Sequence, residues 1–116
     1  MTGRAARLGL VLLGGAVGTG IRVALGAWVE AAPATLTVNL AGALLLGILT
    51  ARVPAPDAPT RVALGTGLLG SFTTWSGLAF LLADSPTPLD LGCALAAVLV
   101  GVPLAALGLR IGARRG

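Results

Sequence analysis

The chain of 116 residues is 56% hydrophobic and only 10% charged, with 18 glycines, one cysteine and no histidine. A soluble domain of this length cannot bury so much apolar surface, because small domains remove too little of their area from water. The single cysteine excludes a disulfide within the chain, and no His/Cys metal cluster is available. The net charge of +4 comes from arginines that form no run suited to nucleic acid. The composition therefore predicts a protein of the lipid bilayer.

Charged residues divide the chain into four apolar stretches, each close to the roughly 20 residues that a helix needs to cross about 30 Å of hydrocarbon. The first stretch is interrupted only by Arg22 and is too long for the apolar part of a signal peptide. Proline-containing segments separate the stretches. We expect an all-α membrane protein with a single transmembrane domain over residues 1–116. Its four transmembrane helices are expected at 8–29, 33–51, 62–83 and 91–109.

The two sides that four spans define carry opposite charge. The side of both termini holds Asp57 and the arginines Arg4, Arg7, Arg52, Arg61, Arg110, Arg114 and Arg115. The other side holds Glu30, Asp84 and Asp90 and no arginine. Cytoplasmic loops of membrane proteins carry the excess of basic residues. We therefore expect cytoplasmic termini and one fixed orientation.

Arg22 lies well inside the first span, where a charge is costly. Gly14 and Gly18 precede it at intervals of four residues, so small residues that favour close packing share its helix face. In one interpretation the long side chain reaches water on the side of Glu30. In the other, its charge faces an aqueous vestibule and raises the local concentration of anions.

Asn39 lies about a turn and a half into the second span, and Thr35 is one turn before it on the same helix face. Amides and hydroxyls commonly form hydrogen bonds between membrane helices, which is one interpretation of this pair. The other is a donor at the entrance of a pore, because the amide of asparagine supplies two N–H groups to an anion.

The third span is a poor helix former near its middle. Residues 65–77 combine glycines with hydroxyl residues, and the midpoint of the span falls between Phe72 and Thr73. Broken helices near the bilayer midplane are a recurring device for ion sites. Trp75 is also unusual at this depth, because tryptophan favours interfaces, and its positive ring edge suits an anion. We expect the third helix to be broken here, the alternative being a packing seam of small residues with an aromatic filler.

Four short helices leave no room for an axial pore, so a transport path must be shared between subunits. If two copies run antiparallel, their two breaks meet on the two-fold axis, where backbone carbonyls are able to cage one cation. An antiparallel dimer would combine a shared path with such a cation site.

Three sequence motifs resemble those of the CrcB/Fluc fluoride-channel family and, with the four spans, cover almost the whole chain. They are Gly14-Gly-Ala-Val-Gly-Thr-Gly-Ile-Arg22, then Thr35-Leu-Thr-Val-Asn39 with Gly42 and Gly47, then Gly67-Leu-Leu-Gly-Ser-Phe-Thr-Thr-Trp-Ser76. The resemblance implies a dual-topology dimer with two fluoride paths and a central structural sodium ion. It further implies passive export of fluoride across the bacterial plasma membrane (the cell inner membrane), which relieves fluoride toxicity in the cytoplasm.

The resemblance also assigns residues to these roles. The backbone carbonyls of Gly70 and Thr73 would bind the sodium ion. The fluoride path would be lined by Arg22, Thr35, Asn39, Thr74, Trp75, Ser76 and Leu78.

The chain departs from the family pattern at the pore aromatics. Trp75 and Leu78 stand where the family has two phenylalanines, and an alignment of the fourth span places Cys93 and Ala97 where a tyrosine and a serine usually line the path. Together with the fixed orientation, these losses suggest that the subunit pairs with an oppositely oriented homologue rather than with itself. Homodimer and heterodimer both remain open.

Other functions fit less well. A small multidrug exporter also has four helices, but its chemistry needs a carboxylate inside the membrane, whereas the acids here lie at span ends. A non-conducting structural partner subunit is a further alternative. An enzyme is not predicted, because no nucleophile–base pair or metal constellation is present.

Overall fold

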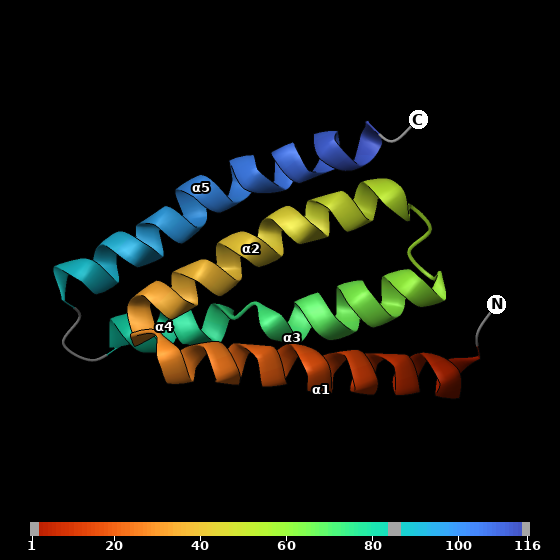
Figure 1. The fold of residues 1–116 in the computed structure, drawn as a ribbon, viewed down its shortest axis with the longest axis horizontal. Coiled ribbons are helices and arrows are strands. Elements are labelled where there is room, and N and C mark those ends of the chain that lie inside the picture. Colours follow the sequence, from red (N-terminus) through yellow and green to blue (C-terminus); the bar gives the residue numbers. More distant parts are fainter. Residues whose placement is uncertain (1–2, 84–86, 115–116) are drawn as a thin grey trace.

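The computed structural model describes residues 3–83 and 87–114, and every regular element in these ranges is helical. Figure 1 shows α5 lying along α2, and α1 lying along the row that η1 and α3 form; α1 begins and α5 ends at the same end of the molecule. In chain order the elements are α1 (Arg4–Trp28), α2 (Ala31–Arg52), η1 (Arg61–Leu69), α3 (Gly70–Phe72), α4 (Trp75–Ala83) and α5 (Pro88–Ala113).

Helices α1, α2 and α5 are each long and apolar enough to cross a membrane. They cover the first, second and fourth predicted spans and extend a few residues beyond most of the predicted limits. With 25 residues, α1 is about 37 Å long at 1.5 Å per residue. The third predicted span, 62–83, is instead divided among η1, α3 and α4. The first, second and fourth predicted spans are thus single helices, and the third predicted span is interrupted.

The helices are packed in two pairs through glycines. In the α2–α5 pair, a Cβ atom added at Gly47 would meet the carbonyl of Ala105, and one at Gly108 would meet that of Leu44. In the α1–η1 pair, a Cβ atom at Gly14 would meet the carbonyl of Ala63. Backbones approach this closely where small residues face each other, which is how helices associate in membranes.

Helix α4 packs on α2 and α5 and makes no contact with α1 within the described ranges. Many large apolar side chains outside the two seams are exposed. Leu12 and Val102 are each 72% exposed, whereas Val38 in α2 is the large side chain that is most deeply buried, at 1%. Apolar surface on this scale is a mark of contact with lipid or with another chain.

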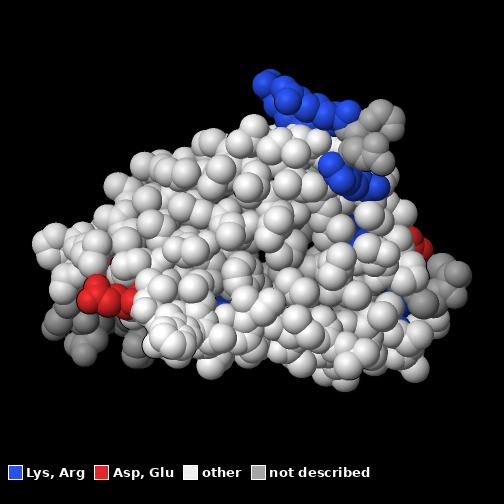
Figure 2. Space-filling view, viewed as in Figure 1, with Lys and Arg blue, Asp and Glu red and all other residues white. Residues whose placement is uncertain are grey.

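The charges separate along the long axis of the molecule. Figure 2 shows most of the basic side chains gathered at the end where α1 begins and α5 ends, together with a small acidic patch, and a larger acidic patch at the opposite end. Arg52 and Arg110 lie in the last turns of α2 and α5, and Arg61 opens η1, where its Nη1 donates to the carbonyl of Val53 at 2.8 Å. Asp84 and Arg115, which belong to the predicted charge pattern, lie outside the described residues.

Candidate functional site

The chain leaves the helical conformation where the sequence predicts a break. Helix α3 ends at Phe72, Thr73 is extended with φ −78° and ψ 156°, and α4 begins at Trp75. The preceding segment η1 is a π-helix, in which the amide of Gly70 reaches back five residues to the carbonyl of Gly65. π-Helices are rare and frequently lie at functional sites. Where the helix gives way to an extended residue, backbone N–H and C=O groups lose their helical partners and must find others.

Asn39 supplies partners from α2. Its Nδ2 donates to the carbonyl of Thr74 at 3.1 Å, and its Oδ1 accepts from the amide of Thr74 at 2.8 Å. The side-chain amide thus pairs with a backbone residue as a neighbouring β-strand would. One N–H of Asn39 is left over, which is one fewer than the two that the pore-donor interpretation allowed it.

Arg22 supplies a second partner from α1. Its Nε donates to the carbonyl of Ser71 at 3.0 Å, and its side chain is half-buried. Ser71 is held from the same helix, because its hydroxyl donates to the carbonyl of Gly15 at 2.9 Å. Neither Nη group of Arg22 makes a hydrogen bond to the described residues, so the charged end of the side chain keeps its donors. The hydrogen bond to Ser71 belongs to neither of the two interpretations of Arg22 offered by the sequence.

The break redirects amides away from two carbonyls. In a continuous α-helix the amide of Thr74 would donate to Gly70, and that of Gly77 would donate to Thr73. Here the amide of Thr74 donates to Asn39, and the amide of Gly77 donates to the hydroxyl of Thr74 at 2.8 Å. The carbonyls of Gly70 and Thr73 therefore lose their usual helical partners. Unwound backbone carbonyls of this kind coordinate monovalent cations in membrane proteins.

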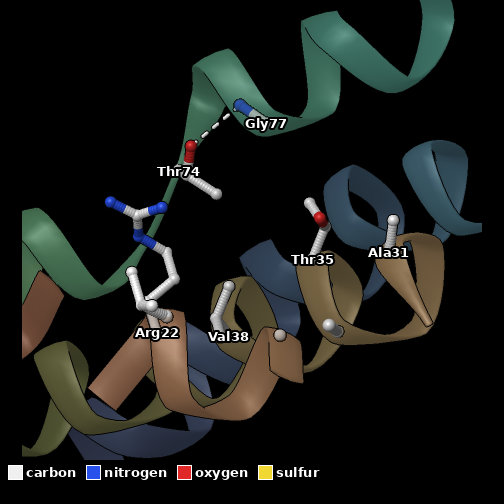
Figure 3. Close-up of a pocket in the computed structure, with 9 residues that line it drawn as sticks. Arg22, Ala31, Thr35, Val38, Thr74 and Gly77 are labelled. Atoms are coloured by element: carbon white, nitrogen blue, oxygen red, sulfur yellow. Dashed lines mark hydrogen bonds between the residues drawn. The ribbon is translucent and has the colours of Figure 1, made fainter. Parts of the chain in front are cut away.

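Two hollows lie on different sides of this break. The first, of about 300 Å³, is lined by Arg22 from α1, Thr35 from α2, and Thr74 and Gly77 from the start of α4. Figure 3 shows the guanidinium of Arg22 extending toward Thr74, with Thr35 and Val38 along the wall that α2 forms. Apart from the guanidinium its polar groups are neutral, so the hollow suits a small anion.

The second hollow, of about 210 Å³, is lined by Asn39 and Gly42 from α2 and by Gly70 and Thr73 from the break. The methyl group of Thr73 lies directly against Gly42, where a side chain on α2 would displace it. The two residues predicted to bind a cation thus line one hollow.

The remaining predicted path residues are placed differently. Trp75 is 76% exposed and lines an apolar hollow between α4 and α5 with Leu95 and Val98, so it takes no part in the first hollow. Ser76 is exposed, with its hydroxyl 3.2 Å from that of Thr74. The side chain of Leu78 lies outside the described part of the chain.

Sequence reasoning gave no separate role to Ser71 and Gly42. Both stand inside motifs that carry the family resemblance, but only the contacts with Gly15 and Thr73 reveal their roles. No periodicity distinguishes them from the other small residues.

In the part of the chain that the structure describes, the elements are helical, and three helices are long and apolar enough to cross a membrane. These features define the class of small multi-pass membrane proteins. The profile of the family described as CrcB-like protein, Camphor Resistance (CrcB), matches residues 9–113, and the chain belongs to this family.

Similar proteins carry channel names. "Fluoride-specific ion channel FluC 2" of Corynebacterium jeikeium is 35% identical over 131 aligned positions, which cover 89% of this chain and 77% of that protein. "Fluoride-specific ion channel FluC" of Thermus thermophilus is 39% identical, with 89% of this chain and 91% of that protein covered. The protein of the same name in Pseudomonas fluorescens is 38% identical, with 79% and 85% covered.

Proposed function

We propose that this chain is a subunit of a fluoride-specific ion channel that lets fluoride leave the cytoplasm passively. The observation that carries the proposal is the hollow at the helix break, where the guanidinium of Arg22 extends toward Thr74 and Thr35 lines the wall. The proposal is also supported by similar proteins that are named fluoride-specific ion channels and align with this chain over most of their length. A passive conductance needs a path and donors, and it requires no catalytic group.

The fluoride path begins at this hollow. Fluoride is small and strongly hydrated, so a path must offer hydrogen-bond donors in place of water. The Nη groups of Arg22, the hydroxyl of Thr35 and the remaining N–H of Asn39 are such donors. Thr74, Ser76, Trp75 and Leu78 continue the proposed path, with the positive ring edge of Trp75 toward the anion. Because Trp75 is exposed within one chain, its part of the path would be completed by a second subunit.

The assembly we propose is an antiparallel dimer with a structural sodium ion on its axis. One chain offers the two carbonyls of Gly70 and Thr73, and a second chain in the opposite orientation would offer two more. The residues fit this ion, because both carbonyls lack their helical amide, and Gly70 and Thr73 line one hollow. Sodium would supply charge that joins the two subunits.

In the bilayer, η1, α3 and α4 together would form the fourth crossing beside α1, α2 and α5. The arginines gathered at one end support a cytoplasmic location of the termini in a bacterial cell, because cytoplasmic loops carry the excess of basic residues. The same bias favours one orientation for every copy. We therefore propose that the partner is an oppositely oriented homologue, although a homodimer satisfies the same geometry.

A second candidate is a non-conducting partner subunit. The exposure of Trp75 and the replacement of a pore phenylalanine by Leu78 favour it, since both remove path-lining groups from this chain. A multidrug exporter finds less support, because the described acids Glu30, Asp57 and Asp90 lie at helix ends or in a loop.

The test is fluoride efflux from liposomes that contain the purified chain, alone and with an adjacent homologue co-expressed. Efflux from the chain alone supports the homodimer and removes the heterodimer hypothesis. Efflux only with the homologue supports an obligate heterodimer. An absence of efflux in both preparations, with protein correctly inserted, would contradict the channel function and favour the structural subunit. Liposomes loaded with chloride provide the selectivity control.

A further inference from the structure

We propose that Asn39 is a positioning residue for the cation site and that it orients the carbonyl of Thr73 without touching the ion. The inference rests on the proposed function for the existence of a cation at Gly70 and Thr73. It assigns Asn39 a task separate from lining the fluoride path.

The argument begins with the peptide bond between Thr73 and Thr74. Its atoms lie in one plane, and in the trans form the carbonyl of Thr73 and the amide of Thr74 point in opposite directions. Oδ1 of Asn39 holds that amide at 2.8 Å. The same hydrogen bond therefore fixes the direction of the Thr73 carbonyl, which points away from the amide of Asn39.

The second hydrogen bond of Asn39 removes the remaining freedom. Nδ2 donates to the carbonyl of Thr74 at 3.1 Å, so the side chain engages both backbone groups of one residue. Two parallel bonds prevent rotation about Thr74 that a single bond would permit. The amide of Asn39 is consequently a substitute for the helical backbone that is missing at this point.

Thr73 is held from two further directions. Its hydroxyl donates to the carbonyl of Leu69 at 2.9 Å, and its methyl group lies against Gly42, three residues after Asn39 on α2. Asn39 and Gly42 belong to one face of α2 and border the same hollow as Gly70 and Thr73. This face of α2 therefore acts as a template for the extended residue, and Asn39 is its polar contact.

A role limited to the fluoride path would produce a different pattern. A path donor uses its N–H groups on the ion and leaves its oxygen free, whereas Oδ1 of Asn39 makes the shorter of the two bonds. Loss of a path donor would change fluoride conduction but not the binding of a cation in the absence of fluoride. Loss of a positioning residue would weaken cation binding whether or not fluoride is present.

The experiment measures sodium binding by thermal unfolding of the purified full chain, in the assembly that it forms in detergent and without fluoride. The unfolding midpoint is recorded as sodium chloride replaces choline chloride at constant ionic strength. Asn39→Leu keeps the approximate shape of the side chain and removes both hydrogen bonds. We expect the sodium concentration that gives half the full stabilisation to rise at least tenfold. Thr37→Val is the matched control, because its hydroxyl donates only within α2, to the carbonyl of Pro33, and the curve should not move.

If Asn39→Leu does not yield folded protein, Asn39→Ala is the variant that decides, with the same expected rise. A folded variant that has a lower midpoint but an unchanged sodium dependence would overturn the proposal, because Asn39 would then be only a structural contact. The proposal would also be overturned if the unfolding midpoint of the unmodified chain did not change with sodium concentration. Fluoride efflux from the same preparations keeps the two ideas apart, since efflux without any response to sodium leaves the channel function standing while this inference fails.

Discussion

Replacement of Arg22 by glutamine tests whether its charge serves the anion. Arg22 lines the hollow of about 300 Å³, and an anion paired with its guanidinium there would lie about 4 Å from the charge. At that distance a unit charge pair interacts by about 1 kcal/mol in bulk water and about 4 kcal/mol at an effective dielectric constant of 20. An open hollow falls between these limits, at about 2 kcal/mol, which is about 30-fold in anion occupancy.

The assay is the initial rate of fluoride efflux from liposomes, measured at low fluoride in the assembly that conducts. We expect Arg22→Gln to lower the rate about 30-fold and Arg22→Lys to lower it less, because lysine keeps the charge. The deficit of the glutamine variant should narrow near 1 M salt, where the screening length falls from about 10 Å to about 3 Å. An Arg22→Gln variant with an unchanged rate at low salt would refute the electrostatic reasoning and leave Arg22 with its bond to Ser71 alone.

Three further predictions concern the packing of the helices. Gly108→Leu should destabilise the α2–α5 pair by about 3 kcal/mol or more through overpacking, seen as loss of a monodisperse elution profile. Gly92→Ala in the same helix is the control: a Cβ atom there meets nothing within 4 Å, and the elution profile should stay monodisperse. Ser71→Ala should lower stability by about 1 kcal/mol, seen as a lower thermal midpoint, because the carbonyl of Gly15 loses its donor. Arg61→Ala should remove the donor of the Val53 and Pro54 carbonyls, which directly follow α2, and lower stability by about 1 kcal/mol. Amide hydrogen exchange after residue 52 should become faster, and unchanged exchange would contradict this.

Composition and spacing predict much of the fold because the bilayer demands long apolar helices. Stretches of about 20 apolar residues indicate α1, α2 and α5 without knowledge of any contact, and their limits differ from the helices by a few residues. The glycines and hydroxyl residues of 65–77 likewise predict a break at Thr73, since a poor helix former at this depth must find other partners.

What the sequence does not reveal is how the released backbone groups are paired. Asn39 looks like a donor with two free N–H groups, but its amide is largely taken up by Thr74, which lies 35 positions later in the chain. The π-helical form of η1 and the exposure of Trp75 are likewise not indicated by the helix propensities of the local sequence.

The seam between α2 and α5 has a consequence for biosynthesis. Gly47 and Gly108 face each other although 60 residues of chain separate them, and α5 follows every other described helix in the order of synthesis. Until α5 has entered the membrane, the narrow glycine face of α2 has no counterpart. A chain whose synthesis stops before residue 108 would thus leave this face of α2 without its packing partner in the bilayer. The packing of α2, the helix that carries Asn39, is therefore complete only after α5 has been synthesised.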